Sequence, residues 1–234
     1  DVYFEDFHGD LIPDELATSS DSGTITTNVG LSGNKAGVAS ILRLDNSNNG
    51  DNEMSEVDLG ATAYRVQEGH VYMEVRLACQ DVSVMAVNVG FSDDTLEGGN
   101  TLPVELSGTT WTTTATTWIG FAFDADATTD NWAAMWVDDD NDSSVAIGTL
   151  MSDVALADET WYTLRLDLHD AGSGNQVIAE WNVKDENGNE WNYRNTSTID
   201  RDAALVPHIG NELRAAANNG IVDIDYIEVG RTRG

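Results

Sequence analysis

In the stretch WYTLRLDLH, residues 161–169, apolar and polar side chains alternate without interruption from Tyr162 onward. Successive side chains of an extended strand point to opposite faces, so this alternation separates an apolar face from a polar one. The apolar face consists of Tyr162, Leu164, Leu166 and Leu168. The opposite face consists of Thr163, Arg165, Asp167 and His169. The stretch therefore predicts a β-strand with one buried and one solvated face.

The same two-residue period recurs along the chain, whereas helical periodicity is weak. We expect further strands at residues 82–91, 118–124, 131–137, 145–148, 176–183, 190–193 and 221–229. Asn187-Gly188 is a strong turn dipeptide and predicts a hairpin joining two of them. Many short strands with almost no helix predict an all-β fold, a two-sheet antiparallel jelly-roll sandwich. No connector has the composition of a domain linker, so we expect a single domain over residues 1–234.

The charge balance excludes two classes of partner. The chain has 41 Asp and Glu against 11 Lys and Arg, a formal net charge of −30. Phosphate backbones and anionic membranes both select clustered cations, so we expect no nucleic acid and no membrane as a partner. The hydrophobic content of 41% is enough for a folded core.

The excess of acidic residues also indicates the ionic strength at which the protein is stable. Self-repulsion of this size destabilises a compact chain at low ionic strength. Molar salt shortens the Debye length to about 3 Å and removes much of that penalty. The composition therefore favours a marine or halophilic source.

The single cysteine and the histidines show no pattern of a reactive or metal-binding site. Cys79 shares the apolar face of an alternating run, which predicts core packing. His8, His70, His169 and His208 are too far apart for any local zinc spacing, and each is expected at the surface or in packing.

Four segments, in this order, carry a family resemblance. They are YFEDFHG at residues 3–9, YMEVRL at 72–77, the strand at 161–168 leading into VIAEWNV at 177–183, and IVDIDYIEV at 221–229. Together they resemble the concanavalin A-like, or laminin-G-like, jelly-roll domains. The resemblance implies that the first and last strands lie side by side, so that both termini contribute to the core.

The last of these segments, preceded by LVPHI at 205–209, resembles domains in structural and decoration proteins of tailed phages, especially marine ones. That resemblance implies a non-enzymatic virion protein, a capsid decoration or fibre component at the virion surface. Its partners would be the major capsid protein or other virion proteins, and it would form a homo-oligomer. The alternative is a secreted, extracellular lectin-like module that binds carbohydrate, with or without the help of calcium.

An acidic run is the candidate cation site. DDDND at residues 138–142 places carboxylates at alternate positions, as in calcium loops, and the candidate ligands are Asp138, Asp140 and Asp142. The run departs from the EF-hand pattern, with Ser143 at the sixth position and Thr149 at the twelfth. The alternative is a solvated acidic turn, and no other cofactor is expected.

Most of the seven tryptophans sit inside alternating strands, where core packing is the expected role. Trp111, flanked on both sides by threonines, lies in the least core-like context. It is the candidate for an exposed ring that contacts carbohydrate.

A glycoside hydrolase is the third possibility. Laminarinase-like enzymes of this fold carry Glu-x-Asp-x-x-Glu on one strand, and DIDYIE at residues 223–228 resembles it with Asp at the first position. Asp223 and Glu228 would reach one face only across a β-bulge, and retaining chemistry would require them about 5 to 5.5 Å apart. Regular alternation instead turns Val222, Ile224 and Tyr226 to the core, with Asp223 and Asp225 in solvent. We therefore expect no catalytic residues.

Overall fold

The computed structural model describes residues 2–7, 12–21, 23–29, 40–46, 50–60, 62–93, 101–128, 131–139, 146–215 and 220–233. Within these ranges the strand pairings are antiparallel. The helical elements there are two single 3₁₀ turns, η1 (Val66–Glu68) and η2 (Val82–Val84). No helix in the described ranges is long and apolar enough to cross a membrane.

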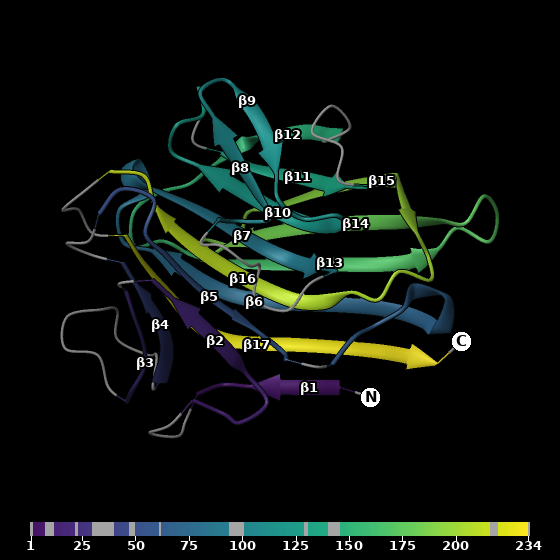
Figure 1. Cartoon of the computed structure of the whole chain (residues 1–234), viewed down its shortest axis with the longest axis horizontal. Coiled ribbons are helices and arrows are strands. Elements are labelled where there is room, and N and C mark those ends of the chain that lie inside the picture. The colour runs from purple at the N-terminus through teal and green to yellow at the C-terminus, as the bar shows by residue number, and fades with distance from the viewer. Residues whose placement is uncertain are drawn as a thin grey trace.

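The strands form two stacked sheets, as predicted (Figure 1). The eight-stranded sheet has the order β15 (Glu190–Asp200), β14 (Gln176–Asp185), β13 (Trp161–Asp170), β6 (Gly69–Cys79), β17 (Ile221–Arg233), β4 (Ser40–Asp45) and β3 (Thr24–Val29), with β1 (Val2–Glu5) also paired to β17. The seven-stranded sheet has the order β12 (Ala146–Ala155), β11 (Asn131–Val137), β10 (Trp118–Asp124), β7 (Met85–Ser92), β16 (Val206–Leu213), β5 (Met54–Asp58) and β2 (Ala17–Ser20). A small separate pair consists of β8 (Val104–Ser107) and β9 (Thr110–Thr113).

The first and last strands lie side by side, as the family resemblance implied. Val2 is opposite Gly230 and Phe4 is opposite Glu228. Figure 1 shows β1 running along β17, with the two chain ends near each other.

The main core fills the space between the two sheets. The apolar face of β13 is buried there, which confirms the prediction from residues 161–169. Trp181 of β14 crosses to the other sheet, where its Nε1 donates a hydrogen bond to the Gly120 carbonyl at 2.9 Å. Cys79 is buried in this core, and burial raises the pKa of its thiol to about 12. The thiol is thus protonated and inert at neutral pH, as core packing predicts.

Local predictions were wrong in two segments. Residues 82–84 form η2 rather than strand, because the Asp81 carboxylate accepts a hydrogen bond from the Ser83 N–H and closes a turn. In β17 the register shifts between Ile224 and Tyr226, which is a β-bulge. The bulge turns Tyr226 outward and brings Ile227 to the core in its place.

The β8–β9 pair packs against part of the outer face of the seven-stranded sheet. A second apolar cluster joins them to β10 and β11. Beside it lies a buried charged cluster, in which the Arg214 guanidinium donates to Asp124 at 2.5 Å and to Glu212 at 2.7 Å. Glu105 of β8 is 3.6 Å from the same guanidinium. The cluster therefore ties the small hairpin to the sheet beneath it.

Candidate functional site

The outer face of the eight-stranded sheet carries the candidate site. Alternation turns one set of side chains from its central strands toward solvent, and most of that set is charged or forms hydrogen bonds. We call this surface the polar face, and it comprises His70, Tyr72, Glu74, Arg76, Arg165, Asp167, Glu180, Asn182, Asn192, Tyr226 and Glu228.

Arg165 lies at the centre of the polar face. Its guanidinium makes two hydrogen bonds to Asp167, at 2.8 and 2.9 Å, and a third to Glu74 at 3.2 Å. It also lies over the ring of Tyr72, 4.6 Å from the centroid. The hydrogen bonding to Asp167 is the largest cause that raises the pKa of Arg165 above its ordinary value. The charge of Asp167 and the hydrogen bond and charge of Glu74 raise this pKa as well, whereas partial burial lowers it. The guanidinium is therefore charged and held in one plane.

Two tyrosines bind two glutamates reciprocally across β6 and β17. The Tyr72 hydroxyl donates to Glu228 at 2.8 Å, and the Tyr226 hydroxyl donates to Glu74 at 2.7 Å. Burial, followed by the bond to Glu228, raises the pKa of Tyr72 to about 12. Burial and Glu74 raise the pKa of Tyr226 as well. Both phenols thus stay protonated, and each fixes the orientation of one carboxylate.

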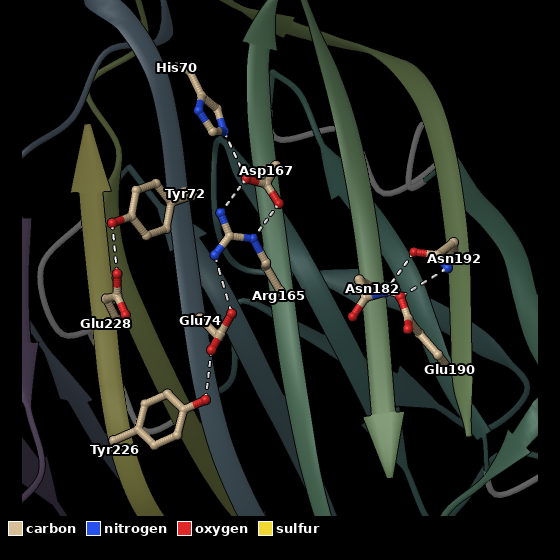
Figure 2. A network of polar contacts seen from close by, with 10 residues as sticks. All are labelled: His70, Tyr72, Glu74, Arg165, Asp167, Asn182, Glu190, Asn192, Tyr226 and Glu228. Carbon is tan, nitrogen blue, oxygen red and sulfur yellow. Dashed lines mark hydrogen bonds and ion pairs between the residues drawn. The ribbon is translucent and has the colours of Figure 1, made fainter. Parts of the chain in front are cut away.

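Two histidines meet at one end of this network. The rings of His70 and His169 stack at 4.3 Å with an angle of 7° between their planes. His70 Nε2 lies 2.8 Å from Asp167 (Figure 2). Burial and the neighbouring His70 lower the pKa of His169. The lone pairs of imidazole nitrogens lie in the plane of the ring, so two stacked rings cannot both direct a lone pair at one metal ion. The two histidines therefore make a packing contact and do not form a metal site together.

A shallow pocket of about 540 Å³ opens over β13, β14 and β15. Its polar lining is Arg165, Asp167, Glu180, Asn182, Glu190, Asn192 and Arg194. Asn182 Nδ2 donates to Glu190 at 2.7 Å and to Asn192 Oδ1 at 2.6 Å. Arg194 and Glu180 form an ion pair at 2.9 Å. The pocket thus presents fixed donors and acceptors to solvent, as Figure 2 shows for its amide cluster.

An exposed aromatic ring lies at the opposite edge of the polar face. Phe4 of β1 is 55% exposed, and its ring lies 5.9 Å from that of Tyr226. In the sequence, Phe4 stands out only as part of the opening segment at residues 3–9, which carries the family resemblance. A large apolar side chain outward on an edge strand is the signal that identifies it.

Trp111 does not have the exposure expected of it. The residue is 9% exposed, and its ring packs in the second apolar cluster with Trp118 and Leu106. The small β8–β9 hairpin buries its tryptophan because it folds down onto the seven-stranded sheet. Little of the ring is left for a sugar to contact.

The acidic run is described only in part. Asp138 is half-buried, and burial is the main cause that raises the pKa of its carboxyl. Asp140 and Asp142 lie outside the described residues. Within the described ranges no group of three or more His, Cys, Asp or Glu could hold a metal ion. The calcium site at residues 138–142 stays a prediction.

Asp223 and Glu228 do share a face, because the bulge in β17 brings both outward. The prediction that Asp223 lies in solvent was wrong, because the residue is buried, with both carboxylate oxygens bound to Arg43 at 2.7 and 2.9 Å. With one bulged residue between them, the two positions are four strand steps apart, roughly 13 Å at about 3.3 Å per step. Retaining hydrolysis requires carboxylates about 5 to 5.5 Å apart, so this pair does not fit it.

Comparison with solved structures shows what the fold is similar to. Peanut lectin with a nine-residue peptide has a TM-score of 0.63 at 10% identity, over 97% of this chain and 95% of that chain. Lectin II from Ulex europaeus has a TM-score of 0.60 at 8% identity, over 97% of both chains. The metal-free carbohydrate recognition domain of Emp46p has 0.55 at 11% identity, over 92% and 87%. The fold is therefore the concanavalin A-like sandwich of the lectins.

These similarities concern the fold alone, since the identities are near 10%. No protein-family model matches the sequence, and no curated protein matches it.

Proposed function

We propose that this protein is a non-catalytic, lectin-like module that binds carbohydrate on its polar face. The observation that carries the proposal is the ordered array of donors and acceptors around an open pocket, centred on Arg165. Sugars present hydroxyl groups that both donate and accept, and they are bound by polar groups whose geometry is fixed in advance. Peanut lectin and lectin II from Ulex europaeus, two solved structures of similar fold, support the same class of function.

The charge of the polar face favours a neutral glycan. The guanidinium groups of the polar face and of the pocket lining are paired with carboxylates, as Arg165 is with Asp167 and Arg194 with Glu180. An anionic glycan would have to displace these carboxylates and approach a chain of net charge −30. A neutral polyol can use the unoccupied lone pairs and N–H groups of the same pairs without that penalty.

Glycan binding tests the proposal directly. The full chain is applied to an array of neutral and acidic glycans, with and without a calcium chelator. We expect neutral glycans to bind, and Arg165→Met to weaken binding at least about tenfold, because hydrogen bonds from a charged donor are lost. Comparison of glycan binding with and without the chelator shows whether calcium contributes to binding.

Arg65→Met is the matched control, since Arg65 is an exposed arginine outside the polar face. It should leave binding unchanged. An array without binding, or equal losses in both variants at unchanged melting temperature, would refute a glycan site at Arg165.

A virion decoration role is the second candidate. The observation that favours it is the edge strand β1, where Val2 and Phe4 are 62% and 55% exposed. Apolar side chains on an edge strand suit a contact with another protein, such as a capsid or fibre subunit. Co-purification with intact virus particles would support this role.

A further inference from the structure

One row of outward side chains crosses the eight-stranded sheet from edge to edge. Each member lies directly opposite the next on the neighbouring strand. We call it the central row, and in order it is Phe4 of β1, Glu228 of β17, Glu74 of β6, Arg165 of β13, Asn182 of β14 and Asn192 of β15. Among the described strands, β1 and β15 are the outermost at this level of the sheet.

The length of the central row can be obtained from the strand spacing. Five intervals of about 4.8 Å give a track of roughly 24 Å. A pyranose ring with its glycosidic oxygen, built from bonds of about 1.4 to 1.5 Å, advances a glycan chain by roughly 5 Å. The row is thus about five sugar units long, which is much more than a single terminal sugar would cover.

The chemistry along the row changes from an apolar end to a polar one. At one end the exposed Phe4 ring, near Tyr226, offers a face on which the C–H side of a sugar can stack. In the middle, Glu228 and Glu74 are held as acceptors by tyrosine hydroxyls, and Arg165 is held as a donor. At the other end the amides of Asn182 and Asn192 line the 540 Å³ pocket.

We propose that the polar face binds an internal stretch of a linear neutral glycan, about five units long, lying across the strands along the central row. This rests on the proposed function and adds to it the length and linear form of the ligand. Because the row reaches both edges of the sheet, the glycan chain can continue past each end. Recognition therefore does not depend on a terminal sugar.

The test measures affinity against chain length by calorimetry on the full chain. The probes are β-1,3-glucose, β-1,4-glucose and β-1,4-mannose oligomers of one, two, four and six units, with the same length series for any other linear polysaccharide bound on the array. We expect affinity to rise with each length and the hexamer to bind at least about tenfold more tightly than the dimer.

Variants at the two ends of the row give a second readout. Phe4→Ala and Asn192→Ala, both at exposed positions, should each weaken hexamer binding about tenfold and affect monosaccharide binding little. Thr196→Ala is the matched control on β15, since Thr196 is also exposed and lies outside the central row.

The outcomes separate the two proposals. Equal affinity for all lengths, binding confined to branched or terminal structures, or no effect of the end variants would overturn the extended track and leave glycan binding intact. The absence of binding to any glycan would overturn both.

Discussion

Replacing Arg214 by methionine is expected to lower the free energy of unfolding by about 3 to 5 kcal/mol. Arg214 is 7% exposed and holds the side chains of Asp124 and Glu212, which are 0% and 1% exposed. Methionine fills much of the same volume but has no charge. The substitution therefore leaves two buried carboxylates facing each other without a cation.

The register of the seven-stranded sheet explains why one guanidinium serves both carboxylates. Asp124 and Glu212 lie opposite the same residue, Ala86, from its two sides. The small side chain of Ala86 leaves room above β7, and the guanidinium of Arg214 bridges the two carboxylates there. Among the described arginines that form ion pairs, Arg214 is the most deeply buried.

Urea unfolding and thermal melting check this prediction. A loss of this size corresponds to a fall in melting temperature of about 10 °C for a chain of this length. The control is Arg194→Met, because the ion pair of Arg194 with Glu180 is largely exposed at 64% and 47%. Exposed pairs contribute about 0 to 1 kcal/mol, so the control should melt nearly as the parent does. Comparable losses in the two variants would contradict a buried role for Arg214.

The sandwich could be predicted from the sequence because the signals for its strands and turns are local. Alternation in residues 161–169 and the Asn187-Gly188 turn each involve neighbours in the chain, and both predictions were confirmed. Outward positions such as Arg165 and Asp167 follow from the same alternation. Their identity as outward residues could therefore be read from the sequence.

The partners of these residues could not be predicted, because they depend on long-range register. Glu74 and Arg165 are 91 positions apart, and Tyr226 and Glu74 are 152 apart. The contact of Tyr226 with Glu74 also requires the bulge in β17, for which the sequence gives no recognised signal. The Arg214 cluster likewise joins residues of three strands that are distant in the chain, so no local pattern in the sequence indicates it.

We expect the Glu212→Gln variant to become more stable relative to the parent as pH rises. Removing a carboxylate whose pKa is lowered on folding would give the opposite trend. Burial, together with Glu105 and Asp124 and against the effect of Arg214, raises the pKa of Glu212 from its ordinary value of 4.5 to about 7. Between these pH values the folded state holds a proton that the unfolded state has lost. The parent therefore loses stability as pH rises through this window, by about 3 kcal/mol in all.

The measurement is the difference in free energy of unfolding between the Glu212→Gln variant and the parent, from pH 4 to pH 8. Other carboxylates titrate in both proteins, so their contribution largely cancels in the difference. Near pH 4 the difference reflects only packing and hydrogen bonding of the amide. Above pH 7 it should have moved in favour of the variant by about 3 kcal/mol. A difference that does not change with pH would show that Glu212 ionises freely in the folded protein.

Combining the two substitutions separates charge from packing. Arg214 is the group that lowers the pKa of Glu212, so Arg214→Met should raise that pKa further and extend the window above pH 7. At pH 8, Glu212→Gln should then stabilise the Arg214→Met protein more than it stabilises the parent, because it removes one of two unpaired buried carboxylates. Independent sites add within about 0.5 kcal/mol, so a coupling free energy well beyond that is expected. Simple additivity at pH 8 would mean that Arg214 stabilises the hairpin by packing, and that its charge contributes little.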